Sequence, residues 1–343
     1  MAPVLTADQR LRALGAVIGA AAGDALGAPY EFQPPIAPSE EVAMVGGGML
    51  GWEPAEWTDE TSMGIVILEV AAELLPGAAL SSPDALDSIA VGWHAWSLNT
   101  TDIGQLTSDV ISRAVKSAAQ DGRPVPDRTD FEAAARAIYE SGHLTAGNGA
   151  LMRTHAIVPG SLHLEPGRFT ETVLATTRLT HVDPDAADAA VLWAHAVRHA
   201  IFTGQIAFDA GLSHLPADRR DAWRARIAEA ADTPPSYFAR DGWVVHTFQA
   251  ACAAITSAGD VPADKFAQRA FLSAVLDRSV RAGFDTDTVA CTAGALVGAA
   301  LGANAVDPTW RRELHGWPEY RVEDLEALVE RVLDRVDEAL AGA

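Results

Sequence analysis

Two short segments of the chain place paired carboxylates beside threonine hydroxyls. Thr58-Asp59-Glu60-Thr61 lies more than two hundred residues before Asp285-Thr286-Asp287-Thr288. An apolar run that could form a helix follows each segment at once. Both offer only hard oxygen ligands, which Mg²⁺, Mn²⁺ and Ca²⁺ prefer. Together the two segments predict a single metal site assembled from both ends of the chain.

Helix capping is the alternative interpretation of each segment taken alone. Threonine and aspartate cap free N–H groups, and acids in a first turn complement the helix dipole. The density of charge favours a metal centre for the pair, because four converging carboxylates would raise one another's pKa strongly. Two divalent cations would neutralise them, with threonine hydroxyls and water completing near-octahedral shells.

Several other polar residues are candidates for a ligand site. Gly147–Arg153 is a flexible turn leading into a possible helix, and it is either an ordinary turn or an anion site built from backbone amides. His181 either touches a ligand or is a satisfied loop histidine, and Asp102 by itself is typical of a helix N-cap. His195 and His199 have a zinc-binding spacing, but no glutamate follows His195, which indicates a structural or surface pair.

The elements that must position these residues are predicted to be helices, because alanine is abundant and β-branched alternation is scarce. The clearest amphipathic stripe runs along residues 322–341. No repeat or linker interrupts the pattern, so we expect an all-α fold in one compact domain over residues 8–342. The predicted helices span 8–27, 61–75, 84–98, 102–120, 129–140, 167–179, 185–203, 216–231, 242–258, 264–281, 288–302 and 322–341.

Two features of the first sixty residues bear on the site. Gly15, Gly19, Gly23 and Gly27 recur every four residues in the first helix. Each glycine costs about 1 kcal/mol in a helix interior, so the stripe predicts a neighbouring backbone packed very close. Residues 33–57, rich in proline and glycine, form a long irregular segment that we interpret as a mobile functional flap.

The amino-acid composition limits which binding partners and which cellular compartment we expect for this protein. The net charge of −21 disfavours bulk binding to nucleic acid or anionic membranes. Cys252 and Cys291 lie in apolar segments, so a disulfide scaffold is not expected and a reducing cytoplasm fits. Asp24 interrupts the first apolar segment, and no run is expected to be long and apolar enough to span a membrane.

Six ordered motifs resemble the ADP-ribosylglycohydrolases, the family that includes the dinitrogenase reductase-activating glycohydrolase and the ADP-ribosylhydrolases. The resemblance runs from Gly15 to about Gly302. It is carried by Gly19–Phe32, Trp57–Thr61, Asp102–Gly104, Gly147–Thr154, Thr180–Pro184 and Gly283–Ala295.

The resemblance implies an all-α fold, a centre of two Mg²⁺ or Mn²⁺ ions and hydrolysis of a bond to C1″ of ADP-ribose. Glu31 matches a flap glutamate that lies near the scissile bond in the family, Asp102 matches an aspartate considered catalytic in some members, and we expect one of them to act as acid or base. Arginine-linked ADP-ribose on a protein is the default substrate, with serine-, nucleobase- or acetyl-linked conjugates as alternatives. By motif position the metal ligands would be Thr58, Asp59, Glu60, Asp285, Asp287 and Thr288, and the substrate-binding residues Gly147, Asn148, Gly149 and His181.

One residue departs from the family pattern. Glu60 stands where the family usually has aspartate, and its extra methylene moves the carboxylate by about one C–C bond, although Mg²⁺ demands near-ideal geometry. Glu60 could ligate directly, ligate through water or tune the choice of metal. The departure also leaves open a catalytically silent homologue that only binds ADP-ribose. A phosphohydrolase of the HD type and a prenyl-type lyase are disfavoured, because the chain has neither an HD dipeptide nor a DDxxD motif.

Overall fold

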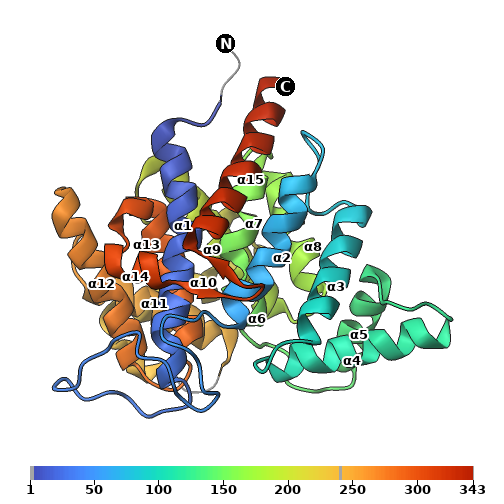
Figure 1. Ribbon diagram of the computed structural model, residues 1–343, viewed down its shortest axis with the longest axis horizontal. Helices are drawn as coiled ribbons and strands as arrows, with labels where there is room; N and C mark the ends of the chain where they lie inside the picture. The colour runs from blue at the N-terminus through green and yellow to red at the C-terminus, as the bar shows by residue number, and fades with distance from the viewer. Residues whose placement is uncertain (1–3, 239–241, 343) are drawn as a thin grey trace.

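Helices are the dominant element of the computed structural model, which describes residues 4–238 and 242–342 (Figure 1). This confirms the all-α class, and every predicted helix is present. The long helices are α1 (Ala7–Gly27), α2 (Asp59–Glu73), α3 (Pro83–Ser97), α4 (Gln105–Gln120), α5 (Arg128–Glu140), α8 (Pro166–Arg178), α9 (Pro184–Thr203), α10 (Arg220–Asp232), α11 (Val244–Ser257), α12 (Lys265–Arg281), α13 (Thr286–Leu301) and α15 (Val322–Gly342).

Shorter elements connect these helices. Two single-turn helices, α6 (Gly149–Met152) and α7 (Thr154–Ile157), follow the predicted glycine turn, and α14 spans Pro308–Glu313. A small antiparallel hairpin pairs β1 (His315–Gly316) with β2 (Tyr320–Arg321). The 3₁₀ turns are η1 (Ala28–Tyr30), η2 (Pro159–Ser161), η3 (Leu212–His214), η4 (Pro235–Tyr237) and η5 (Ala303–Ala305).

The start of α4 differs from the prediction for a local reason. The helix begins at Gln105 rather than at residue 102, and its N-cap is Gly104. Thr100 Oγ1 accepts a hydrogen bond from the Asp102 N–H at 3.2 Å and donates to the Asp102 carbonyl at 2.7 Å. A side chain that bonds nearby backbone in this way competes with helix formation. Asp102 is therefore not an N-cap, and its carboxylate remains available for another role.

The glycine stripe of α1 packs against α13, which runs antiparallel to it in the centre of the molecule (Figure 1). A Cβ at Gly15 would lie 2.3 Å from the carbonyl oxygen of Gly298, and a Cβ at Gly27 would lie 2.4 Å from Cα of Asp287. Only hydrogen at Cα permits such a close approach. The predicted backbone neighbour is confirmed, and it is the helix that carries the second acidic segment.

The hydrophobic core is shared by both ends of the chain. Buried residues of α1, α2, α9, α11, α13 and α15 belong to one contiguous cluster. The amphipathic stripe of α15 is buried as its spacing predicts, including Leu325, Val329 and Leu333. This shared core supports the predicted single domain over residues 8–342, which nonetheless stays a prediction.

The expectation that no segment could span a membrane needs correction. The helical stretch Ala7–Tyr30 has 24 residues, its most apolar 18-residue window has a mean hydropathy of 1.3, and by length and composition it could cross one. In the fold, however, 89% of its most apolar window is buried inside the protein. The apolar character of α1 is accounted for by its central place against α13.

The irregular segment between η1 and α2 is tied to the helices at several points. The Tyr30 hydroxyl accepts a hydrogen bond from the Ala43 N–H at 2.9 Å and lies 3.0 Å from the Ala43 carbonyl. Arg281 of α12 donates to the carbonyls of Ala37 and Glu40, both at 2.8 Å. The segment is the blue loop at the lower left of Figure 1. Its mobility stays a prediction.

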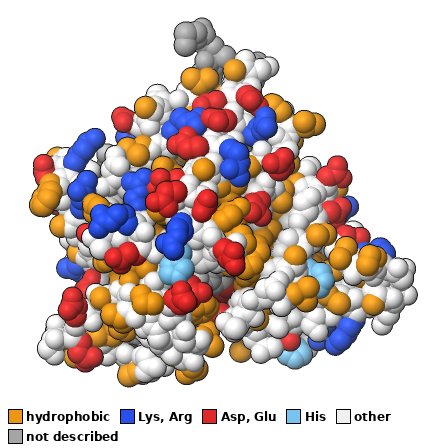
Figure 2. Space-filling model, viewed as in Figure 1, with side chains coloured by type: hydrophobic (Ala, Val, Ile, Leu, Met, Phe, Trp, Pro, Cys, Tyr) orange, Lys and Arg blue, Asp and Glu red, His pale blue; other side chains and the backbone are white. Residues whose placement is uncertain are grey.

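Charge is dispersed on the face of the molecule shown in Figure 2. Acidic and basic side chains are interspersed over it rather than gathered into one acidic field. The surface charge on this face therefore does not by itself mark a functional site.

Candidate active site

The first acidic segment is held by a buried carboxylate that the sequence analysis did not assign to the site. Asp24, on α1, accepts hydrogen bonds from the backbone N–H groups of Thr58 at 2.9 Å and Thr61 at 3.0 Å. The Thr61 hydroxyl donates to it at 2.5 Å, and the Thr58 hydroxyl oxygen lies 2.8 Å from it. Asp24 is fully buried. It thus fixes the first turn of α2, from which Asp59 and Glu60 project.

The second acidic segment also lies at a helix start without acting as a cap. Asp285 occupies the N-cap position of α13, but its side chain makes no capping hydrogen bond. Instead Asp285 Oδ2 accepts from Asn148 Nδ2 at 2.5 Å and from the Thr247 hydroxyl at 3.4 Å. Thr58, at the N-cap of α2, likewise makes no side-chain cap. The capping interpretation is therefore wrong for these two residues.

A backbone bridge aligns Glu31 with the start of α13. The N–H of Phe32 donates to the carbonyl of Phe284 at 2.6 Å, and the N–H of Phe284 donates to the carbonyl of Gln33, also at 2.6 Å. Phe32 and Phe284 have φ of 63° and 61°, a left-handed conformation that is costly for residues with a Cβ. The fold maintains this strain beside two residues of the cleft, Glu31 and Asp285.

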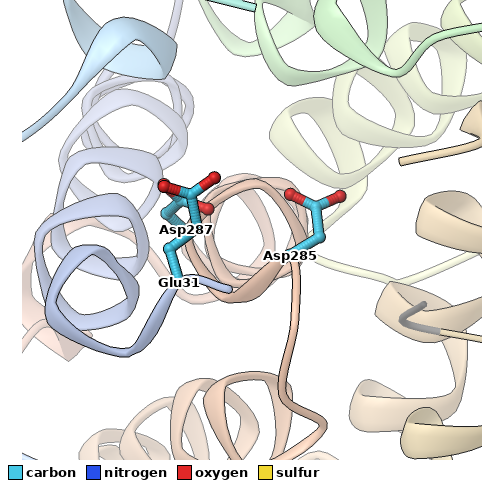
Figure 3. A group of neighbouring side chains, drawn as sticks. All are labelled: Glu31, Asp285 and Asp287. Carbon is cyan, nitrogen blue, oxygen red and sulfur yellow. The ribbon is translucent and has the colours of Figure 1, made fainter. Parts of the chain in front are cut away.

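Three carboxylates converge on the first turn of α13 (Figure 3). One oxygen from each of Glu31, Asp285 and Asp287 lies within 4.8 Å of the others. Glu31 comes from the loop after η1, and its side chain lies beside that of Asp287 in this view. The two predicted segments do meet, since the Thr288 hydroxyl donates to Glu60 Oε1 at 2.7 Å and Glu60 Oε2 contacts the Thr58 hydroxyl.

A cleft of about 310 Å³ opens above these groups. The sequence singled out residues in six separate segments, and the cleft brings most of them together. Thr58 and Asp287 are buried and do not line it. The predicted site residues in its walls are Glu31, Asp59, Glu60, Asp102, Gly147, Asn148, Gly149, His181, Asp285 and Thr288.

Burial and like charge raise the pKa of the carboxyl groups in the cleft. Burial, followed by the charge of Asp102, raises the pKa of Glu31 to about 9. Burial, followed by the charges of Glu60 and Asp285, raises the pKa of Asp102 to about 7. The pKa of Asp285 is raised to about 6, mainly by burial. Burial also raises the pKa of Asp287, with Glu60 as the largest charge contribution.

His181 presents a hydrogen-bond donor beside the glycine turn. Arg153 Nη2 donates to the Thr180 hydroxyl at 2.8 Å, and that hydroxyl lies 2.8 Å from His181 Nδ1. The threonine proton therefore goes to Nδ1, which places the ring proton on Nε2. Burial lowers the pKa of His181 to about 3, so the ring is neutral. A Cβ at Gly149 would lie 3.1 Å from Cε1 of the His181 ring, so any larger residue there would require the ring to shift.

Arg153 itself does not reach the cleft. Its side chain is 1% exposed and stacks on Trp93, with Cζ 4.3 Å from the ring centroid. Arg153 is therefore not placed to contact an anion bound at the Gly147–Gly149 turn. Its role is to orient Thr180 and, through Thr180, the ring of His181.

His195, the first of the two histidines with zinc-binding spacing, has a structural role in the core. His195 Nε2 lies 2.9 Å from the Thr170 hydroxyl, and its ring stacks on His214 with centroids 4.0 Å apart. Burial lowers the pKa of His195 to about 3. Both features account for a neutral histidine in the core.

Sequence reasoning overlooked Asp24 and Thr247. A lone carboxylate inside an apolar glycine-striped helix was the available signal for Asp24. Thr247 gave none, because a threonine within α11 is unremarkable until the fold brings its hydroxyl to Asp285 and Asn148.

The donor set fits divalent cations such as Mg²⁺ or Mn²⁺. The oxygens of Glu31, Asp285 and Asp287 are hard ligands close enough to share an ion. Glu31 Oε2 is buried and accepts no hydrogen bond within the described part of the chain. A buried carboxylate oxygen in that state is costly unless a cation or proton meets it. The cluster is therefore suited to a cation on both chemical and energetic grounds.

The fold is that of a known class of helical hydrolase. A solved structure described as an "ADP-ribosylglycohydrolase-related protein complex" superposes with a TM-score of 0.66, covering 96% of this chain and 100% of that one at 24% sequence identity. The model of the ADP-ribosylglycohydrolase family matches residues 5–341. The chain therefore belongs to the ADP-ribosylglycohydrolase family, whose members hydrolyse glycosidic bonds.

Two relatives show how far the likeness extends. The chain is 28% identical to the "ADP-ribosylarginine hydrolase Tri1" of Pseudomonas putida (strain GB-1), over 98% of this chain and 84% of that protein. It is also 28% identical to the "ADP-ribosyl-[dinitrogen reductase] glycohydrolase" of Rhodospirillum rubrum, over 88% of this chain and 90% of that protein.

Proposed function

We propose that this protein is a divalent-cation-dependent hydrolase that cleaves the bond at C1″ of ADP-ribose, with arginine-linked ADP-ribose on a protein as its substrate. The observation that carries the proposal is the convergence of Glu31, Asp102 and Asp285 on one cleft, with Asp287 close to Glu31 and Asp285. The names of the two relatives favour arginine as the leaving group. We place its action in the cytoplasm, where thiols such as its two free cysteines stay reduced.

The carboxylates divide between two tasks in this proposal. Glu31, Asp285 and Asp287 would hold one of the two cations, and Asp59 with the hydroxyls of Thr58 and Thr288 would contribute to the second. A bound cation would supply Lewis-acid polarisation of ribose oxygens and of the attacking water. Asp102 lies outside the three-carboxylate group and lines the cleft, so it is available for proton transfer.

Asp102 is the better of the two acid–base candidates. Cleavage of a ribosyl bond passes through an oxocarbenium-like state, which needs a proton for the leaving group and a base for the water. General acid–base catalysis is most efficient when the pKa of the group lies near the operating pH. Burial is the largest cause that raises the pKa of Asp102 above the usual range of an aspartate, and bound cations would leave that cause in place, whereas Glu31 belongs to the group that would hold a cation. No covalent intermediate is required.

The glycine turn and His181 would bind the rest of the substrate. The Nε2 proton of His181 and the Gly147–Gly149 turn lie along the cleft wall. A neutral donor there suits the oxygens of a pyrophosphate or a ribose. Asn148 would contribute both to cation binding and to substrate binding, because its side chain donates a hydrogen bond to Asp285 and its backbone belongs to the glycine turn.

The test is release of ADP-ribose from a panel of arginine-, serine-, nucleobase- and acetyl-linked substrates with Mg²⁺, Mn²⁺ or EDTA. Asp285→Ala and Asp287→Ala should each abolish cation-dependent release, and Asp260→Ala, on the exposed turn before α12, is the matched control. Full activity in both site variants would refute the mechanism. Tight ADP-ribose binding in calorimetry without turnover on any conjugate would instead indicate the catalytically silent homologue.

A further inference from the structure

Glu60 occupies an unusual position between the two halves of the site. Its Oε1 accepts the hydroxyl proton of Thr288 at 2.7 Å, and its Oε2 contacts the hydroxyl of Thr58. Thr58 precedes α2, whereas Thr288 lies in the first turn of α13. One carboxylate thus joins two threonines that are 230 residues apart in the chain, and all three side chains are buried.

The Thr58 hydroxyl has one proton and two carboxylate neighbours, Glu60 Oε2 and Asp24 Oδ1. Asp24 receives three other hydrogen bonds, from the Thr58 N–H, the Thr61 N–H and the Thr61 hydroxyl. Asp24 therefore remains satisfied without the hydroxyl of Thr58. The Thr58 proton is thus free to serve Glu60, and both hydroxyls can donate to the same carboxylate.

Glu60 is not part of the group that could share one cation. Among residues that the structure describes, that group consists of Glu31, Asp285 and Asp287. When a threonine hydroxyl donates its proton to Glu60, the lone pairs of its oxygen point elsewhere and can coordinate a cation. Side chains that orient metal ligands in this way commonly change metal affinity ten- to a hundred-fold when altered.

We infer that Glu60 is a positioning residue that bridges Thr58 and Thr288, so that it orients both hydroxyls toward the cations and locks α2 to α13. The extra methylene of glutamate, compared with aspartate, lets one carboxylate contact both threonine hydroxyls. The inference rests on the proposed function only for the identity of the bound ions, because the bridge itself is made by the protein alone.

Glu60→Asp separates this role from direct ligation. The variant keeps the charge, shortens the side chain and introduces the aspartate that other members of the family usually have. A bridging Glu60 predicts that Mn²⁺ binding, measured by electron paramagnetic resonance of the free ion, weakens about ten-fold or more in Glu60→Asp. A direct ligand would predict affinity kept or improved. Glu73→Asp, exposed at the far end of α2, is the control.

A second measurement uses the metal-free protein and does not depend on the proposed function. In EDTA, the thermal midpoints of Glu60→Asp, Thr288→Val and the double variant form a thermodynamic cycle. If the bridge exists, the two substitutions remove the same interaction, so their effects on stability are not additive. The double variant should then be scarcely less stable than the less stable of the two single variants. Additive losses, or unchanged Mn²⁺ affinity in Glu60→Asp, would overturn the inference. Absence of Mn²⁺ binding by the wild type would instead refute the cation mechanism, and the cycle would then decide the bridge by itself.

Discussion

The close contact between α1 and α13 makes a quantitative prediction at Gly23. A Cβ there would lie 2.1 Å from the carbonyl oxygen of Ala290 and 2.4 Å from its carbonyl carbon. These are backbone atoms within α13, so the helices must separate by about 1 Å to relieve the clash. Overpacking of a close-packed core costs about 3 kcal/mol at the upper end of its usual range. Alanine returns about 1 kcal/mol through its helix preference.

Gly23→Ala should therefore lose about 2 kcal/mol of unfolding free energy, measured by chemical denaturation. Gly167→Ala in α8 is the matched control, because a Cβ there would meet nothing within 4 Å. That variant should be as stable as the wild type or slightly more stable. If Gly23→Ala equals Gly167→Ala in stability, the close approach of α1 and α13 is wrong.

Two other glycines of the α1 stripe can separate an effect on stability from an effect on the geometry of the cation site. Gly15→Ala and Gly27→Ala both introduce clashes with backbone, at 2.3 Å from Gly298 O and 2.4 Å from Asp287 Cα. Their stability losses should be comparable, but only Gly27→Ala displaces Asp287. Mn²⁺ affinity should therefore fall in Gly27→Ala and stay near the wild-type value in Gly15→Ala. Equal affinities in the two variants would contradict this account.

Three further outcomes are expected. Asp102→Asn should lower kcat by about 10²–10⁴-fold with little change in ADP-ribose affinity by calorimetry, since it removes the group proposed to move the proton; an unchanged kcat would assign that task elsewhere. A cation at one hundred times its Kd should raise the unfolding free energy by about 2.7 kcal/mol, and a thermal midpoint indifferent to Mg²⁺, Mn²⁺ and EDTA would argue against a cation site. Burial lowers the pKa of His155 to about 4, so the unfolded chain takes up a proton at this ring before the folded protein does. The contribution of the neutral ring to the free energy of unfolding is fully present above pH 6.5 and falls by about 3 kcal/mol as the pH drops from 6.5 through 4. The slope of unfolding free energy against pH in that window should be shallower in His155→Gln.

Much of the helical framework could be predicted because its signals are local. The stripe of α15 and the Asp183-Pro184 start of α9 depend on neighbouring residues alone, and Asp183 does cap α9 by accepting from the Asp185 N–H. The sequence indicated α6 and α7 only as a possible helix after the glycine turn and gave no sign of α14 or the hairpin, because these elements have too few residues to show periodicity. The hairpin matters because the His315 carbonyl accepts from the Trp57 N–H at 2.9 Å, one residue before the first acidic segment.

The candidate site divides in a similar way between sequence and fold. Residue type and motif order brought together Asp59, Asp102, Asp285 and His181, and all four line the cleft. The direction of Arg153, the hydrogen bonds of Asp24 and the reach of Glu60 depend on which side chains the fold brings near, and spacing along the chain carries no such information.

The sequence by itself determined the all-α class, the family and the kinds of atoms available to the site, because periodicity, glycine spacing and ligand chemistry are properties of the residues. Only the tertiary structure decided which of those atoms meet. Glycine removes Cβ wherever it stands, but the antiparallel packing of α13 on α1 is what sets Asp287 beside Gly27. Glu60 likewise offers two acceptors in any fold, and this fold supplies one donor from each half of the site.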